Sequence, residues 1–338
     1  MNQPSEIFVP TLRPAGSLKN LRRAGIYLVA AALLVFALRG IPLASIWESL
    51  RHLAAWQIGI LLVVNALVIL SMTLRWWLVV RAEKSHLPFL PFIACRLAMF
   101  SVSYFTPGPQ LGGEPLQILF LRREHGQSLA RAVSTVIIDK LLEFLGNFLF
   151  IALGLFAFLS TGALPGVSLP QWIWVLLGLV LSWPLLHLFL LARSRLPITY
   201  LLKTFASRFH KHKWFRTALV SERLGAAFVR RHPAFLLGAL FASLLGWSAM
   251  AAEYMLILNF LRVQTGFLQA LSALTASLLA FLVPLPGGLG ALEASQVLAL
   301  GSLGYPAALA ISVTLLLRMR DLLNGGIGLI FAAHLFHR

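Results

Sequence analysis

The chain has 338 residues, of which 59% are hydrophobic and only 12% charged, and its mean hydropathy is +0.84. A water-soluble protein of this length could not bury so much apolar surface, so the composition excludes one and indicates a polytopic membrane protein. The net charge of +17 would suit nucleic-acid binding in a soluble protein, but here it indicates cytoplasmic loops that face anionic lipid. Cys95 is the single cysteine, which excludes an internal disulfide.

Apolar stretches follow one another along the chain at about 24–39, 55–80, 88–106, 111–121, 129–160, 170–192, 233–261, 267–283, 288–303 and 305–335. Six of them are long enough to span about 30 Å of hydrocarbon, namely 24–39, 55–80, 129–160, 170–192, 233–261 and 305–335. The others flank two Pro-Gly sites, and 111–121 and 288–303 are too short to cross. We therefore predict an all-α fold of about six spanning helices and two re-entrant hairpins, in a single membrane domain over residues 1–338.

One motif occurs twice. A Pro-Gly pair is followed at identical spacings by Glu and Gln, and then, after a shift of one residue, by a cation and an acid three residues apart. The first copy is Pro107-Gly108, Glu114, Gln117, Lys140 and Glu143, and the second is Pro286-Gly287, Glu293, Gln296, Arg318 and Asp321. Duplicated helix breaks within apolar sequence are typical of transporters whose broken helices meet at a central site. We place repeat one at about 55–160 and repeat two at about 233–335.

Loop charge predicts the orientation of the two copies. Basic clusters mark the cytoplasmic side, and they lie before residue 24, at 81–84, at Arg122-Arg123, at 193–231 and at Arg338. The first cluster precedes the apolar run 26–38, which we interpret as an uncleaved signal anchor. The first hairpin then enters from the cytoplasm and the second from outside, with both termini cytoplasmic. The copies are therefore predicted to form an inverted repeat.

The linker 193–231 contains ten Lys or Arg residues and a single acid, Glu222. Bulky apolar residues lie among the charges: Leu201, Leu202, Phe205, Phe209, Trp214 and Phe215. This composition favours an amphipathic cytoplasmic segment on anionic lipid. The alternative is a solvated linker whose charges only enforce the topology.

Charged residues at membrane depth cost about 2.5–3.5 kcal/mol each on insertion scales, so each needs a structural or functional reason. The acids are Glu114, Asp139, Glu143, Glu253, Glu293 and Asp321, and the cations are Arg75, Arg96, Arg131, Lys140, Arg318 and Arg320. Their signs nearly balance, so one interpretation is a set of buried ion pairs. The pairs Lys140–Glu143 and Arg318–Asp321 have the spacing of neighbours on one helix face.

The other interpretation is a binding site. A Pro-Gly break starts a short helix whose N-terminus carries partial positive charge and unpaired N–H groups, which suit a phosphate. The acids could be proton-linked or could hold an amine, while glycines allow close backbone approach. We expect substrate contacts from Pro107, Gly108, Gly112, Gly113, Glu114, Arg131, Lys140, Glu143, Glu253, Pro286, Gly287, Gly288, Gly290, Glu293, Arg318 and Asp321.

These motifs resemble a known family. The segments that carry the resemblance are Pro107-Gly108, Gly112-Gly113-Glu114, Arg122-Arg123, residues 132–143, and Pro286 to Gly290 with Glu293. Together they are similar to the flippase-like family, the transmembrane region of lysylphosphatidylglycerol synthases and its stand-alone relatives, over about residues 20–335. The resemblance implies a multi-pass protein of the cell inner membrane that moves lipids between leaflets. Gln117 departs from the pattern, since the family often has Arg there. We find no counterpart of the soluble aminoacyl-transferase domain and expect no lysylphosphatidylglycerol synthesis.

The sequence thus predicts a flippase-like transporter of an anionic or amphipathic membrane lipid. An ion-coupled transporter of a small solute and a non-transporting accessory of a lipid-modifying enzyme are the alternatives. Signatures of enzymes and metal sites are absent from the sequence, so we expect no catalytic residues, no metal and no cofactor. The expected partners are a membrane lipid, with an anionic headgroup favoured, and a lipid-biosynthesis enzyme, but no nucleic acid.

Overall fold

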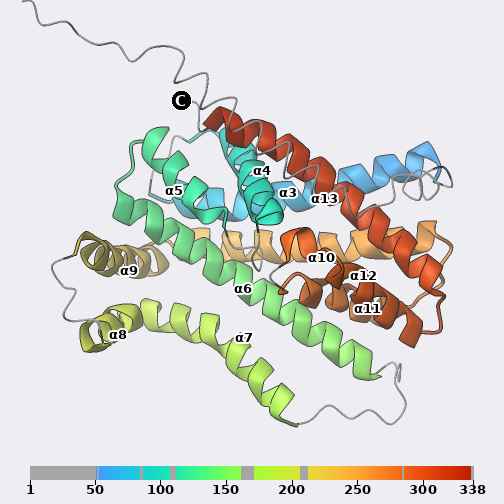
Figure 1. Cartoon of the computed structure of the whole chain (residues 1–338). Coiled ribbons are helices and arrows are strands. Elements are labelled where there is room, and N and C mark those ends of the chain that lie inside the picture. The colour runs from blue at the N-terminus through green and yellow to red at the C-terminus, as the bar shows by residue number, and fades with distance from the viewer. Residues whose placement is uncertain are drawn as a thin grey trace, which may run out of the picture.

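A computed structural model describes residues 51, 53–83, 87–106, 112–160, 171–205, 212–283 and 285–335, and every regular element within these ranges is helical (Figure 1). The helices are α3 (Ala55–Arg81), α4 (Leu90–Phe105), α5 (Glu114–Arg123), α6 (Leu129–Ser160), α7 (Gln171–Ala192), α8 (Pro197–Phe205), α9 (Lys213–Arg231), α10 (Pro233–Phe260), α11 (Phe267–Ala280), α12 (Ala291–Ser302) and α13 (Ala307–Leu335). A 3₁₀ turn, η2, covers Pro286–Gly288. The predicted all-α class is confirmed for the described residues.

Three described helices, α3, α6 and α10, are long and apolar enough to cross a membrane, and α7 with α8 makes a fourth candidate if the bent pair is one span. The helix α13 has 29 residues, but Arg318, Arg320 and Asp321 lie near its middle. Every 18-residue stretch of α13 therefore includes all three charges. The predicted first span, 24–39, lies outside the described residues.

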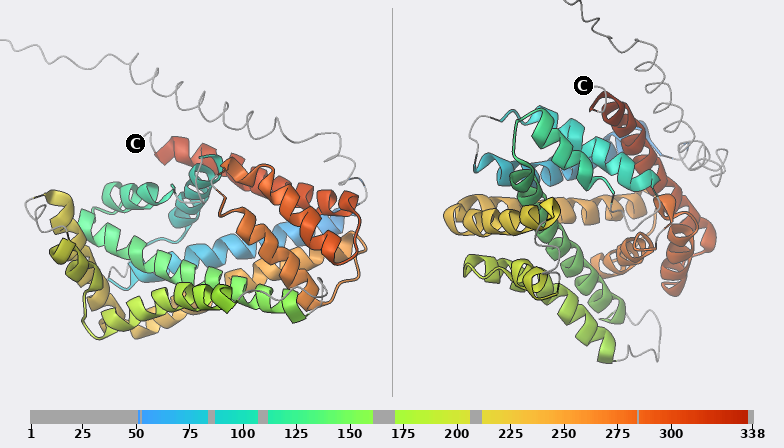
Figure 2. Two further views of the ribbon diagram at one scale, coloured as in Figure 1. Left: turned by 60° about the horizontal axis from the view of Figure 1, so that its bottom comes forward. Right: turned by 60° about the vertical axis from the view of Figure 1, so that its left-hand side comes forward.

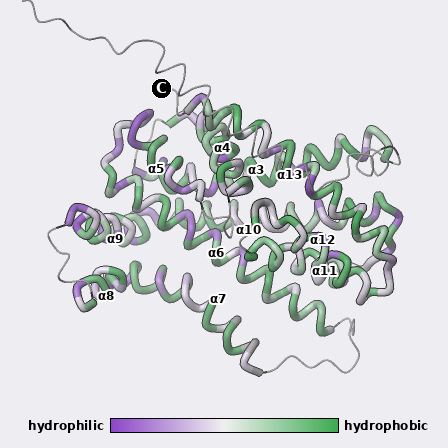
Figure 3. The backbone as a smooth tube through the Cα atoms, viewed as in Figure 1, coloured by the Kyte–Doolittle hydropathy of each residue, from purple (hydrophilic) through white to green (hydrophobic). Residues whose placement is uncertain are grey.

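The long helices have polar residues inside and apolar residues outside. On α3 the buried residues include Asn65, Thr73 and Arg75, whereas Val63 and Leu67 are exposed. This is the reverse of a water-soluble helix and is expected where the outer solvent is lipid. Figure 3 shows hydrophobic residues along most of α3, α7 and α10, with hydrophilic ones gathered at α9.

Two helix crossings depend on glycine. A Cβ on Gly328 of α13 would lie 2.0 Å from the Leu97 carbonyl oxygen of α4, and one on Gly154 of α6 would lie 1.6 Å from Thr275 Oγ1 of α11. Ser101 Oγ also donates to the Gly325 carbonyl oxygen at 2.7 Å. Small residues thus let the helix backbones meet, as is common in membrane proteins. Gly325 and Gly328 both lie in the contact between α13 and α4.

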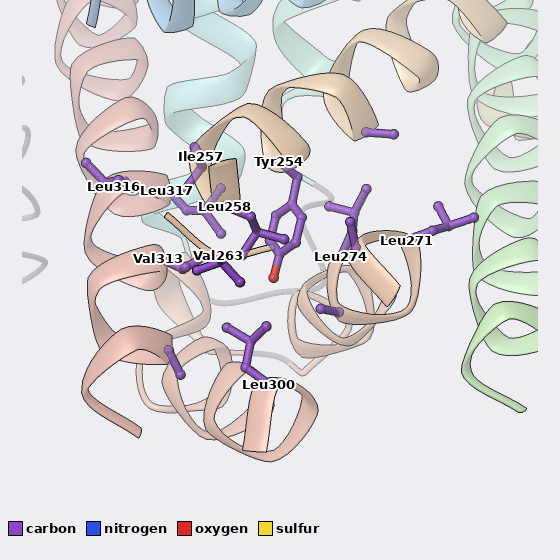
Figure 4. Packing of buried hydrophobic residues seen from close by; sticks show 14 of the residues in the cluster. Tyr254, Ile257, Leu258, Val263, Leu271, Leu274, Leu300, Val313, Leu316 and Leu317 are labelled. Atoms are coloured by element: carbon purple, nitrogen blue, oxygen red, sulfur yellow. The ribbon is translucent and has the colours of Figure 1, made fainter. Parts of the chain in front are cut away.

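The helix contacts occur in matching pairs. Helix α3 packs against α10; α4 packs on α13 as α11 packs on α6; and α5 packs on α6 as α12 packs on α13. Figure 2 shows that the helices of the first copy, α3 to α6, interleave with those of the second copy, α10 to α13, rather than forming a separate body. The largest hydrophobic cluster joins α10, α11, α12 and α13 around Tyr254, Leu258, Leu274 and Leu317 (Figure 4).

Candidate functional site

A cavity of about 260 Å³ lies where the two repeated regions meet. Its lining is contributed by α3, α4, α6, α10, α11 and α13. Six charged side chains take part: Arg96, Lys140, Glu143, Glu253, Arg320 and Asp321. Apolar and aromatic residues form most of the remaining wall, among them Val68, Ile69, Leu97, Phe100, Phe144, Met250 and Leu278. The cavity lining is therefore amphipathic, with three cations, three acids and many apolar side chains.

Beside the cavity, the first copy contains a buried ion-pair network. Arg75 Nε donates to Asp139 Oδ1 at 2.7 Å and Arg75 Nη2 donates to Glu143 Oε2 at 2.6 Å. Arg96 Nη2 lies 3.3 Å from Asp139 Oδ2. Arg75 and Asp139 are fully buried, so each is stable there only with its partners. This network joins α3, α4 and α6 behind the cavity wall.

Lys140 connects this network to the first helix break. Its Nζ lies 2.8 Å from Glu143 Oε1 and 2.8 Å from Glu114 Oε1. Glu114 is the first residue of α5, and its Oε2 accepts the N–H of Gly112 at 2.8 Å. The predicted Lys140–Glu143 pair is confirmed. The start of α5 is therefore tied to α6 through Glu114 and Lys140.

The second copy repeats this connection. Arg318 Nε and Nη2 donate to Glu293 Oε1 and Oε2 at 2.5 and 2.8 Å, and Glu293 Oε2 accepts the N–H of Gly290 at 2.9 Å. Arg318 Nη1 also donates to the Gly287 carbonyl oxygen at 3.0 Å. In each copy the N–H of one glycine just before the short helix, Gly112 or Gly290, is thus bonded to a glutamate, so that N–H is not free for a phosphate.

Arg320 completes the site on the second side. Its Nη1 lies 2.8 Å from Glu253 Oε2 and its Nη2 lies 2.8 Å from Asp321 Oδ1. The predicted Arg318–Asp321 pair is wrong, because Arg318 points toward α12 and binds Glu293 at both carboxylate oxygens. Asp321 instead forms an ion pair with the neighbouring Arg320.

Both helix breaks pack against α4 through glycine. A Cβ on Gly113 would lie 2.4 Å from the Met99 carbonyl oxygen, and one on Gly287 would lie 2.9 Å from Tyr104 Cζ. Gly287, Gly288 and Gly290 have φ of +55°, +61° and +78°, where other residues are strained. The chain therefore needs glycine here for conformation and for close approach.

Residues 24–327 match the family model of the lysylphosphatidylglycerol synthase TM region. The chain belongs to this family. Its resemblance to the lysylphosphatidylglycerol synthase TM region, predicted from the Pro-Gly motifs, is thereby confirmed, and it supports a multi-pass membrane protein related to lipid handling. No protein of curated function matches the chain significantly.

Within this family member, the predicted site residues fall into several groups. Lys140, Glu143, Glu253 and Asp321 line the cavity. A second group forms the hydrogen bonds and ion pairs at the two helix breaks: Gly112, Glu114, Gly287, Gly288, Gly290, Glu293 and Arg318. Gly113 donates its N–H to Ser103 Oγ. Pro107 and Gly108 lie outside the described residues, and so does the Pro286 side chain. Arg131 lies apart from the cavity, where its half-exposed side chain pairs with Glu83 at 2.8 Å.

Sequence reasoning missed the uncharged polar lining. Trp247 and Asn147 line the cavity, and neither Trp247 Nε1 nor Asn147 Oδ1 has a hydrogen-bond partner within the described structure. Asn65 and Asn324, which share a hydrogen bond at 3.2 Å, also line the cavity. In the sequence, the only indication that Asn65, Asn147 and Asn324 belong to the site is that each is an amide within an apolar stretch.

Proposed function

We propose that this protein is a flippase-like transporter that binds an amphipathic membrane lipid and moves its headgroup between leaflets through the central cavity. The observation that carries the proposal is the cavity itself, which is lined by charged residues of both copies together with apolar and aromatic side chains. A lipid has the same division, since its polar headgroup joins apolar chains. Membership of a family associated with lipid handling agrees with this chemistry.

The cavity supports a headgroup with both hydrogen-bond donors and acceptors. Among the lining residues, Arg96 and Lys140 carry donors, and Glu143 and Asn147 carry acceptors. The six charges of the lining cancel, so a headgroup that carries a phosphate and an amine would be better compensated than one with a single net charge. We therefore narrow the expected anionic headgroup to a phosphate-containing one that also offers a donor.

An inverted repeat would give such a cavity a route to both leaflets. The matching helix contacts and the matching pairs Glu114–Lys140 and Glu293–Arg318 support two copies of one unit. Loop charge supports their opposite orientation, and the short helices α5 and α12 support re-entrant hairpins. Rocking one copy against the other would then expose the same site alternately to each side.

Lys140 is the cation that would bind the lipid phosphate and so affect the start of α5. It lines the cavity, and its two partners, Glu114 and Glu143, have side chains that are 20% and 27% exposed. A lipid phosphate could take one of these contacts, because an ammonium is a point charge that exchanges partners readily. Release of Glu114 would loosen the start of α5 and couple binding to movement of the first hairpin.

The test is lipid movement in vesicles that contain the purified protein. Acyl-labelled fluorescent phosphatidylethanolamine is incorporated in both leaflets, and a reductant that cannot cross the bilayer reports exchange between them. We expect rapid exchange with the wild type and a strong loss with Lys140→Gln. Arg131→Gln removes a cation from the same helix outside the cavity and should exchange lipid at the wild-type rate.

Two results would contradict the proposal. One is wild-type vesicles that exchange lipid no faster than protein-free vesicles, which would favour a solute transporter or an accessory role. The other is a folded Lys140→Gln variant with wild-type exchange, which would remove the cavity from the mechanism. Circular dichroism melting of each variant checks that loss of exchange is not loss of folding.

A further inference from the structure

Helix α8 turns sharply away from α7. The axes of Gly178–Ala192 and Pro197–Phe205 differ by 97° across the short connection 193–196. The exposed surface of α7 is apolar, with Val175, Leu179 and Phe189 all more than half exposed, which suits a helix in contact with lipid. When α7 runs across the bilayer, α8 must lie nearly parallel to the membrane surface. Helices α8 and α9 lie together at one end of the molecule (Figures 1 and 2).

A buried carboxylate fixes α8 in this position. Glu222 of α9 is 3% exposed, and its two oxygens accept the N–H groups of Ile198 and Thr199 at 2.7 and 2.6 Å. These N–H groups belong to the first turn of α8, where no partner exists within the helix and negative charge is favourable. Glu222 thus anchors α8 to α9 through the backbone, independently of the side chains that α8 exposes.

Because Glu222 is buried, the exposed charges of the segment 193–231 are all cationic. Glu222 is the single acid between residues 193 and 231, and it is buried under α8. The eight basic residues of this segment that the structure describes are all exposed, among them Lys203, Lys213, Arg216 and Arg223. A surface with eight exposed cations and no exposed acid is complementary to anionic lipid headgroups.

The exposed arc of α8 is amphipathic. Leu201 and Phe205 are one helical turn apart, so they share a face, and they are 52% and 80% exposed. Lys203 lies on the opposite edge of the exposed arc. Phe215, which was grouped with these residues from sequence, is instead buried in the packing of α9. The apolar edge can therefore enter the acyl boundary while Lys203 stays among the headgroups.

We propose that α8 and the exposed face of α9 form an interfacial platform that binds anionic lipid in the headgroup layer, with Glu222 holding α8 in the membrane plane. This platform is separate from the central cavity and does not depend on lipid translocation. Its occupant is the anionic bilayer surface, because charge complementarity and an exposed apolar edge occur together on the same two helices.

Depth measurement by spin labelling tests the position of α8. The native Cys95 is fully buried, so a cysteine introduced in place of Phe205 can be labelled selectively, and Lys203→Cys is the matched control. In vesicles of phosphatidylglycerol and phosphatidylcholine, the label at 205 should be more accessible to oxygen than to a polar nickel reagent, and the label at 203 should show the reverse. Equal, water-like accessibility at both positions would overturn the proposal.

Lipid titration tests the anionic preference. Each cation near an anionic surface contributes about a factor of five, so Arg216→Gln/Arg223→Gln should require about 25-fold more phosphatidylglycerol for half of the rise in melting temperature. Arg122→Gln/Arg123→Gln removes two exposed cations elsewhere and should stay close to wild type. An equal loss in both variants, or equal stabilisation by phosphatidylcholine, would show general electrostatics rather than a platform.

Discussion

Lys140 Nζ lies 2.8 Å from Glu114 Oε1, at the positions that hold Arg318 and Glu293 in the second copy. The two ion pairs bind the start of a short helix to the long helix that follows it. They differ in chemistry, since Lys140 lines the cavity while Arg318 is 1% exposed and also caps a carbonyl of the break. We therefore expect the Lys140 pair to be able to exchange partners with a substrate, and the Arg318 pair to be a fixed structural contact.

This difference predicts unequal tolerance of Lys–Arg exchange. Arg318→Lys keeps the charge but loses the bidentate contact with Glu293 and the bond to Gly287, which should cost about 2–3 kcal/mol in stability. Lys140→Arg keeps the charge in a partly open site and should change stability by less than about 1 kcal/mol. Melting temperatures in detergent compare the two, and equal tolerance would show that Arg318 is not a fixed contact.

The α4–α13 crossing gives a steric prediction. Gly328→Ala places a methyl group 2.0 Å from a backbone oxygen of α4, so the helices must separate and stability should fall by about 1–3 kcal/mol. Gly326→Ala is the control, because the same methyl two residues earlier on α13 meets nothing within 4 Å. Gly326→Ala should be neutral or slightly stabilising. Thermal melting of both variants decides the point, and an undisturbed Gly328→Ala variant would contradict the crossing.

Trp247 gives a prediction about the ligand. Trp247 lines the cavity and its Nε1 has no hydrogen-bond partner within the described structure, so Trp247→Phe removes a donor without breaking a described contact. We expect a small change in stability alone and a reduced rise in melting temperature when phosphatidylethanolamine is added. Trp76→Phe removes another unpartnered buried N–H away from the cavity and should leave the lipid-induced rise unchanged. Equal effects of the two substitutions would argue against a contact between Trp247 and lipid.

Glu222 predicts the rigidity of α8. Replacing it with Gln leaves a single acceptor for the N–H groups of Ile198 and Thr199, so the first turn of α8 should loosen. A spin label at position 205 should then become more mobile, while lipid exchange through the cavity should persist. Ser221→Ala, at the neighbouring buried position, is the control because Ser221 Oγ bonds only within α9. Unchanged mobility in Glu222→Gln would show that side-chain packing alone holds α8.

The amino-acid sequence by itself determined the membrane class, the family and the helix positions. The predicted stretches 55–80, 129–160 and 233–261 differ from α3, α6 and α10 by no more than one residue at either end. Such agreement arises because long apolar runs, and the prolines and glycines that end them, depend on local chemistry and on the thickness of a bilayer. The duplicated motif also identified the glutamates and cations that hold the two breaks.

Only the tertiary structure decided which charges meet. Arg75 binds Asp139 and Glu143, which are more than sixty positions away, and Arg318 binds Glu293 rather than Asp321. The spacing of residues along one helix predicts which of its side chains are neighbours. It does not predict which face of the helix contacts another helix, or where a glycine lets two backbones meet. The same reason hid the roles of Trp247 and Asn147, whose exposure to a cavity depends on six helices arranged around it.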